Sequence, residues 1–236
     1  KSKDKLIRNA IDLIPRIQKA TNSAAESNSI ASRLKFDTEK LIWELNYFKI
    51  HYFTTFKKEP LSPEVDAAID VEFMELSSEL DSTATVLCHR DFHAANLMID
   101  QSNDLRIIDH QDARIGSPTY DLVSLLLDRV TETPSDEWLG RMKDYYFRQR
   151  EVAGLEPLDR EAFELEFQLQ TVQRCLKAAG TFSFQSAARD KTYFIPFIKP
   201  MFRISLQAME RLGRYTTLQE VLRQELAQPF TTSSGT

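Results

Sequence analysis

The fold is decided by residues 86–124, which read VLCHRDFHAANLMIDQSNDLRIIDHQDARIGSPTYDLVS. Asp91 and Asn96 lie five residues apart in a segment of loop composition, and residues 97–99 then start a strand. Residues 101–104 have turn composition and residues 105–108 form the returning strand, so the hairpin is predicted to bring Asp109 back beside Asn96. An oxygen-only set of Asn and Asp suits a hard cation such as magnesium. Asp91, outside that pair, is free to orient a hydroxyl.

This order of residues resembles the catalytic and metal-binding loops of kinases, in which H-R-D-x-x-x-x-N precedes a hairpin and an acidic metal ligand. The D-F-G of protein kinases is absent, and the segment more closely resembles the aminoglycoside phosphotransferase and choline kinase superfamily. Within that superfamily, HRDFHAANLM followed by IIDHQDARIGSPTYDLVSLL is most similar to the bacterial cell-wall sugar kinases. Those enzymes phosphorylate the anomeric hydroxyl of N-acetylmuramate and N-acetylglucosamine.

The resemblance implies a role for each polar residue of the stretch. Asp91 is expected to orient the acceptor hydroxyl and finally accept its proton, as the catalytic residue. Asn96 and Asp109 are expected to hold Mg²⁺ against the phosphates of ATP or GTP. Asp112 is expected either to support this site or to contact substrate, and His93 either to face the substrate or to pack.

Two further segments are similar to the cell-wall sugar kinases. In residues 36–53, Trp43 is expected to stack on a sugar ring and Glu44 to accept its hydroxyl protons. The alternative is that Trp43 belongs to the core and Glu44 is solvated. Residues 173–194 form the second segment. Around it, residues 171–215 hold eight basic and two acidic residues, which suits a carboxylate-bearing sugar or, alternatively, a solvated helix face.

Composition argues against nucleic-acid and membrane partners and favours a cytoplasmic protein. The chain has 236 residues and a net charge of −5, which argues against general nucleic-acid binding. Its two cysteines, Cys88 and Cys175, do not make a disulfide framework and favour a reducing compartment. No apolar run approaches the roughly 20 residues of a membrane span, and the N-terminus lacks the apolar region of a signal peptide.

The glycines predict that part of a kinase is missing. All six, the first being Gly116, follow the catalytic loop, whereas a kinase covers ATP with a glycine-rich loop on an earlier β-lobe. The sequence is therefore expected to be the C-terminal lobe of a two-lobe phosphotransferase, with the nucleotide-binding N-terminal lobe as its missing partner. The predicted divisions are an N-terminal helix and connection (1–34), the kinase-like lobe (35–228) and a flexible tail (229–236).

Hydrophobic periodicity predicts a mainly α (α+β) fold with a short catalytic β-hairpin. A helix over 4–20 with a kink or boundary at Pro15 is followed by a loop at 21–33. Further helices are expected from Asp37 or Thr38 to Phe56, from Ser62 to about Asp81, from Asp121 to Val130, and from Ser135. The last three are expected from Asp159 to about Gly180, over 191–212, and from a capping box at Thr217 to Pro229.

Two other functions compete with a small-molecule kinase. The absence of a glycine-rich lobe favours a non-catalytic, kinase-like binding or regulatory module, which the intact set of Asp91, Asn96 and Asp109 opposes. A protein kinase is disfavoured because only about a dozen residues separate Asp109 from the helix expected at Asp121, too few for an activation segment.

Overall fold

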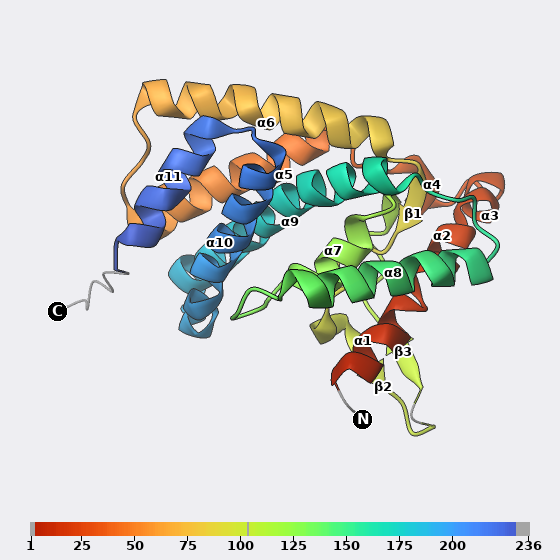
Figure 1. Ribbon diagram of the computed structural model, residues 1–236. Coiled ribbons are helices and arrows are strands. Elements are labelled where there is room, and N and C mark those ends of the chain that lie inside the picture. Colours follow the sequence, from red (N-terminus) through yellow and green to blue (C-terminus); the bar gives the residue numbers. More distant parts are fainter. Residues whose placement is uncertain (1–2, 103, 230–236) are drawn as a thin grey trace.

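The structure is a computed structural model that describes residues 3–102 and 104–229 (Figure 1). Helices dominate, as predicted, and the longest of them, α9, runs between α6 and α8 in this view. The helices are α1 (Lys3–Ile11), α2 (Ile14–Lys19), α3 (Thr21–Glu26), α4 (Ile30–Arg33), α5 (Thr38–Lys49), η1 (Ile50–Lys57), α6 (Pro63–Thr83), η2 (Ala94–Asn96), α7 (Tyr120–Leu127), α8 (Asp136–Val152), α9 (Arg160–Ala188), η3 (Thr192–Phe194), α10 (Ile195–Leu212) and α11 (Thr216–Ala227).

The strands form two short antiparallel pairs. β2 (Leu97–Ile99) pairs with β3 (Leu105–Ile107) in the predicted hairpin, which projects from the lower edge of the molecule in Figure 1. β1 (Val86–Cys88) pairs with β4 (Arg114–Gly116) and joins the two ends of the catalytic segment. Neither pair extends to a third strand within residues 3–102 and 104–229, so the mainly α prediction is confirmed.

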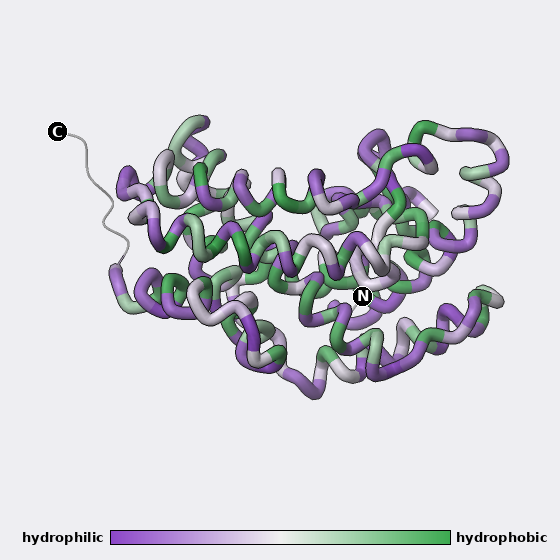
Figure 2. The backbone as a smooth tube through the Cα atoms, turned by 90° about the horizontal axis from the view of Figure 1, so that it is seen from above, coloured by the Kyte–Doolittle hydropathy of each residue, from purple (hydrophilic) through white to green (hydrophobic). Residues whose placement is uncertain are grey.

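Side-chain capping begins several helices where the sequence indicated. Asp37, Ser62, Ser135 and Asp159 each accept a hydrogen bond from the backbone N–H three residues further on. Along the long helices hydrophobic and hydrophilic residues alternate, as expected for helices with one face in the core (Figure 2). The buried cluster is continuous from Ala10, Ile11 and Ile14 of the N-terminal helices to Leu222 of α11.

The first 33 residues differ from the prediction. The helix boundary expected at Pro15 is present but lies at Asp12 and Leu13, and Pro15 lies in the first turn of α2, where its missing N–H costs no helical hydrogen bond. Residues 21–33, predicted as a loop, contain α3 and α4. Ser29 caps α4 by accepting from the backbone N–H of Ser32, so the polar residues that suggested a loop act here as helix ends.

Two other helix boundaries were predicted wrongly. The helix from Asp37 does not run unchanged to Phe56, because residues 50–57 form the π-helix η1, which buries Tyr52 and Phe53. The expected capping box at Thr217 does not form. Instead, the Glu72 carboxylate of α6 accepts the backbone N–H groups of Thr217 and Leu218, each at 2.9 Å. The tail expected at 229–236 lies, beyond Pro229, outside the described residues.

Gly180 lies inside α9 and does not end it, contrary to the prediction. α9 continues through Ala188 because the glycine serves a close contact and not a helix end. A Cβ at this position would lie 2.6 Å from the Cα of Phe48, so the missing side chain lets α5 approach α9 closely. This approach brings Glu44 of α5 within reach of α9.

Gly180→Ala is expected to lower the free energy of unfolding by about 2 kcal/mol, because overpacking against backbone outweighs the helix propensity gained. Gly140→Ala is the matched control. Gly140 lies in α8, and a Cβ there meets no atom within 4 Å. That variant is expected to gain up to about 1 kcal/mol. Urea denaturation of both variants measures the difference, and equal stabilities would contradict the close-contact explanation.

Within residues 3–102 and 104–229, no helix combines the length and the apolar character that crossing a membrane requires.

Candidate active site

The loop after β1 is held by Asp121 of α7. Its carboxylate accepts the backbone N–H groups of His89 at 2.7 Å and of Arg90 at 3.1 Å. Arg90 has a φ of 82°, a conformation that costs a non-glycine residue about 1 kcal/mol or more. Burial raises the pKa of Asp121 to about 6. A carboxylate in the first turn of a helix ordinarily complements the N–H groups of that helix, but the Asp121 carboxylate instead fixes a loop 31 to 32 residues earlier in the chain.

His89 is a packing residue of the same loop. Its ring lies edge-on to Phe92, with centroids 5.8 Å apart, and its Nε2 is 3.1 Å from the carbonyl oxygen of Ile108. Burial lowers the pKa of His89, so the neutral ring is favoured. These contacts tie the loop to the end of the hairpin.

The hairpin brings Asp109 beside Asn96, as the sequence predicted. The N–H of Ile108 donates to the carbonyl oxygen of Asn96 at 3.1 Å, and Asp109 follows directly with a φ of 67°. The Asn96 amide nitrogen donates to the backbone oxygen of Asp91 at 2.9 Å, which leaves the amide oxygen for another partner. One amide oxygen and one exposed carboxylate fit a Mg²⁺ ion that takes its remaining ligands from phosphates and water. The described residues contain no cluster of three His, Cys, Asp or Glu that would cage a metal alone.

Asp91 lies among positive charges. Lys177 Nζ is 3.3 Å from its Oδ1, and the Arg90 guanidinium is 3.9 Å from its Oδ2. Burial alone would raise the pKa of Asp91, but Lys177, Arg174 and Arg90 outweigh it and hold that pKa well below its ordinary value. Asp91 is therefore an anion at neutral pH, able to accept a hydrogen bond from a hydroxyl.

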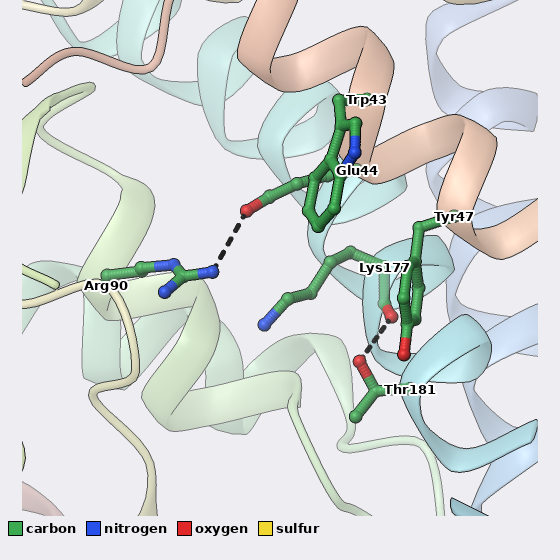
Figure 3. Close-up of a pocket in the computed structure, with 6 residues that line it drawn as sticks. All are labelled: Trp43, Glu44, Tyr47, Arg90, Lys177 and Thr181. Carbon is green, nitrogen blue, oxygen red and sulfur yellow. Dashed lines mark hydrogen bonds and ion pairs between the residues drawn. The ribbon is translucent and has the colours of Figure 1, made fainter. Parts of the chain in front are cut away.

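A cavity of about 210 Å³ lies beside this loop, between α5 and α9 (Figure 3). Its lining residues come from α5, the loop after β1 and α9: Trp43, Glu44, Tyr47, Arg90, Lys177 and Thr181.

Trp43 and Glu44 both line this cavity, and neither has the environment of the alternative in which Trp43 belonged to the core and Glu44 was solvated. Trp43 is 55% exposed, whereas Glu44 is fully buried, so a core tryptophan and a solvated glutamate are both wrong. Glu44 Oε2 accepts from the side-chain amide of Gln173 at 2.9 Å. Its Oε1 has no hydrogen-bond partner and lies 3.6 Å from Arg90. One oxygen of this buried carboxylate is thus left to accept a hydrogen bond at the cavity.

Asp112 and His93 are not among the residues that line the cavity, and each contacts an arginine. The Asp112 carboxylate forms a short ion pair with Arg90, so it contacts the side chain that also approaches Glu44. His93 is buried with its Nε2 3.3 Å from Arg129. Burial, with Arg129 beside the ring, lowers the pKa of His93 to about 4.

The eight basic residues of 171–215 do not line one common surface. Their charge balance therefore does not support a carboxylate-bearing sugar as the acceptor, contrary to the prediction. Arg211 pairs with Asp136, and Arg214 pairs with Glu75 and Glu79, all contributed by other helices. Arg174 is buried, and its guanidinium contacts Tyr120, Ser124 and Asp128. Lys177 alone among the eight lines the cavity.

Sequence reasoning assigned no individual role to Gln173, Arg174 or Lys177, and the last two were counted only among the eight basic residues of 171–215. Their partners Glu44, Tyr120, Asp128 and Asp91 are 46 to 129 residues away, so no local motif joins them. The available signal was their spacing: residues 173, 177 and 181 recur every four positions and share one face of a helix.

Comparison with known proteins agrees with this geometry. An N-acetylmuramate/N-acetylglucosamine kinase of Neisseria meningitidis is 30% identical over 210 residues, which cover 84% of this chain and 60% of the relative. A protein of the same name from Pseudomonas putida is 38% identical over 100 residues, covering 42% of this chain and 29% of the relative.

A third, from Caulobacter vibrioides, is 31% identical over 122 residues, or 50% of this chain and 32% of the relative. The matches thus span less than two thirds of each relative's length. The model of the phosphotransferase enzyme family matches residues 3–158, which include the loop, the hairpin, β4 and α7. The chain belongs to the phosphotransferase enzyme family.

Proposed function

We propose that this protein transfers the γ-phosphoryl group of ATP or GTP to the anomeric hydroxyl of an amino-sugar. The observation that carries the proposal is the position of Asp91. Its loop adjoins a cavity with an exposed tryptophan and a buried carboxylate, and a hairpin brings Asn96 and Asp109 to the same loop. Because the matches span less than two thirds of the relatives, the activity is proposed for the complete gene product.

Asp91 is assigned the role of orienting the acceptor hydroxyl. The hydroxyl oxygen attacks the γ-phosphorus, the bond to the nucleoside diphosphate breaks, and the hydroxyl proton passes to the Asp91 carboxylate late in the step. A pKa held low by Lys177, Arg174 and Arg90 keeps Asp91 ready to accept the hydrogen bond. Asn96 and Asp109 are assigned to a magnesium ion, which when bound offsets the charge of the phosphates.

Trp43 and Glu44 are assigned to the sugar. An exposed indole next to a cavity offers a flat apolar face on which a pyranose ring stacks. Glu44 Oε1 is buried and accepts no hydrogen bond, although Arg90 and Lys40 lie 3.6 and 4.0 Å away, so it can accept one from a sugar hydroxyl or amide N–H at little further desolvation cost. The relatives' names, which state N-acetylmuramate and N-acetylglucosamine, support an acetylated amino-sugar as the acceptor.

A panel assay of the complete gene product tests the proposal. N-acetylmuramate, N-acetylglucosamine, kanamycin and choline are each supplied with ATP and Mg²⁺, and reactions without acceptor correct for ATP hydrolysis. An acetylated sugar is expected to give the highest kcat/KM and a 1-phosphate product, identified by ³¹P NMR. Preferred turnover of kanamycin or choline would overturn the sugar assignment. Nucleotide binding without turnover of any acceptor would favour a non-catalytic module.

A further inference from the structure

Side chains on one face of α9 contact both Glu44 and Asp91 of the candidate site. Gln173, Lys177 and Thr181 recur every four residues, so they lie on one side of the helix. Gln173 holds Glu44 at 2.9 Å, and one turn later Lys177 contacts Asp91 at 3.3 Å. Lys177 also lines the cavity, and Figure 3 shows its chain extending from α9 toward Arg90. Its side chain therefore bridges the acceptor cavity and Asp91.

We propose that Lys177 is a positioning residue of the phosphoryl transfer, which holds the Asp91 carboxylate in place and offsets its charge beside the transferred group. The inference rests on the proposed function and adds to it a residue outside the kinase-like motifs. An anionic carboxylate repels an incoming phosphoryl group, and in a partly buried site this repulsion is poorly screened. An ammonium in contact with that carboxylate reduces the repulsion throughout the reaction.

The other nearby cations are already committed to different partners. The Arg90 guanidinium pairs with Asp112 and lies 3.6 Å from Glu44, and it is farther, at 3.9 Å, from Oδ2 of Asp91. Arg174 is fixed by Tyr120, Ser124 and Asp128, one turn before Lys177. Among the contacts of the described residues, the Lys177 ammonium has Asp91 as its single hydrogen-bond partner. Its two remaining N–H groups are therefore available at the cavity.

The electrostatic surroundings show that a lysine here is costly for folding. Burial and the neighbouring Arg174 lower the pKa of Lys177, although Asp91, Glu44 and Asp128 act in the opposite direction. The remaining titratable groups that interact with Lys177 or Asp91 are Lys40, Arg90, Tyr120, Asp121, His89 and His93. A charge kept at such a position, and in contact with a motif aspartate, is typical of a functional site.

The test separates the charge of Lys177 from its packing. In the complete gene product, Lys177→Met is expected to lower kcat by about a hundredfold while the KM for N-acetylglucosamine changes by less than about threefold. Lys177→Arg is expected to recover at least about a tenth of the wild-type kcat, because it restores the positive charge. Lys191→Met, an exposed lysine beyond the end of α9, is the matched control and is expected to retain wild-type kinetics.

A chemical rescue makes the same distinction within one variant. Lys177→Cys, alkylated with 2-bromoethylamine, regains a lysine-like ammonium as the thiolate displaces bromide. Alkylation with iodoacetamide adds a neutral group of similar length. Cys88 and Cys175 are 0% and 1% exposed, so within this sequence the introduced thiol is the one that reacts, and identically treated wild-type protein corrects for alkylation elsewhere in the gene product. Only the aminoethylated protein is expected to regain activity, and equal activity of the two products would overturn the proposal.

The outcome does not depend on whether the proposed sugar is the acceptor. If the panel assay finds another acceptor, the same kcat comparison is made with that compound. If no acceptor is found, a double-mutant cycle of Tm values for Lys177→Met and Asp91→Asn gives the result. A coupling of at least about 3 °C supports the contact, and additive shifts overturn it. Wild-type activity combined with a normal kcat for Lys177→Met overturns this inference alone and leaves the proposed function intact.

Discussion

Asp91→Ala is expected to lower phosphoryl transfer by the complete gene product by a factor of about 10²–10⁴, the usual contribution of a positioned proton acceptor. The variant removes the carboxylate that is kept anionic by Lys177, Arg174 and Arg90. It leaves the loop intact, because Asn96 and His93 contact the backbone oxygen of Asp91 and not its side chain. Nucleotide binding is expected to be retained, since Asn96 and Asp109 are unchanged.

The measurement is the steady-state kcat, combined with the Tm and with a calorimetric titration of ATP and Mg²⁺. Asp104→Ala is the matched control, because Asp104 is an exposed aspartate near the turn of the nearby hairpin, with its carboxylate 3.7 Å from Arg106. That control is expected to keep wild-type turnover. If purified Asp91→Ala retains more than about a tenth of wild-type turnover, Asp91 is not the proton acceptor.

The hairpin was predictable because the information that specifies it is local. Residues 97–108 contain two short apolar strands around a polar turn, and the pairing of Leu97 with Ile107 follows from that pattern. The caps at Ser62 and Ser135 are local for the same reason, since each side chain bonds a backbone N–H three residues away. Sequence reasoning therefore predicted most helix starts and the relative position of Asn96 and Asp109.

Features that depend on distant partners were missed. Thr217 resembles the start of a capping box, but the carboxylate that α11 uses belongs to Glu72, 145 residues earlier. Gly180 resembles a helix end until Phe48 is known to lie against it. Asp121 resembles a helix-terminus carboxylate, yet it bonds the loop at His89 and Arg90. In each case tertiary contact overrides a local preference.

The candidate acceptor site shows the same division. Trp43 and Glu44 were singled out by resemblance, but the burial of Glu44 depends on α9, which contributes Gln173 as its partner across 129 residues. A glutamate in an amphipathic helix ordinarily faces water. Here the close approach at Gly180 puts α9 next to α5 and buries that side chain, so the burial of Glu44 follows from the packing of two helices.

Arg174→Met is expected to lower the free energy of unfolding by about 3–5 kcal/mol, the usual cost of removing one partner of a buried ion pair. Arg174 is 1% exposed, and its guanidinium donates to Tyr120, Ser124 and Asp128 on and just after α7. Methionine fills much of the same space but leaves the Asp128 carboxylate, 7% exposed, without its 2.8 Å partner. Arg129, 4.0 Å from the other oxygen, offsets only part of this loss.

Chemical denaturation of Arg174→Met and of a matched control, Arg211→Met, measures the effect. Arg211 pairs with Asp136 at the surface, with side chains 42% and 77% exposed, so its loss is expected to cost less than about 1 kcal/mol. The double variant Arg174→Met with Asp128→Asn is expected to recover part of the lost stability, because a neutral amide needs no cation. Recovery would show that α7 and α9 are joined here by charge compensation. Equal losses for Arg174→Met and Arg211→Met would instead show that the buried pair contributes no more than an exposed one.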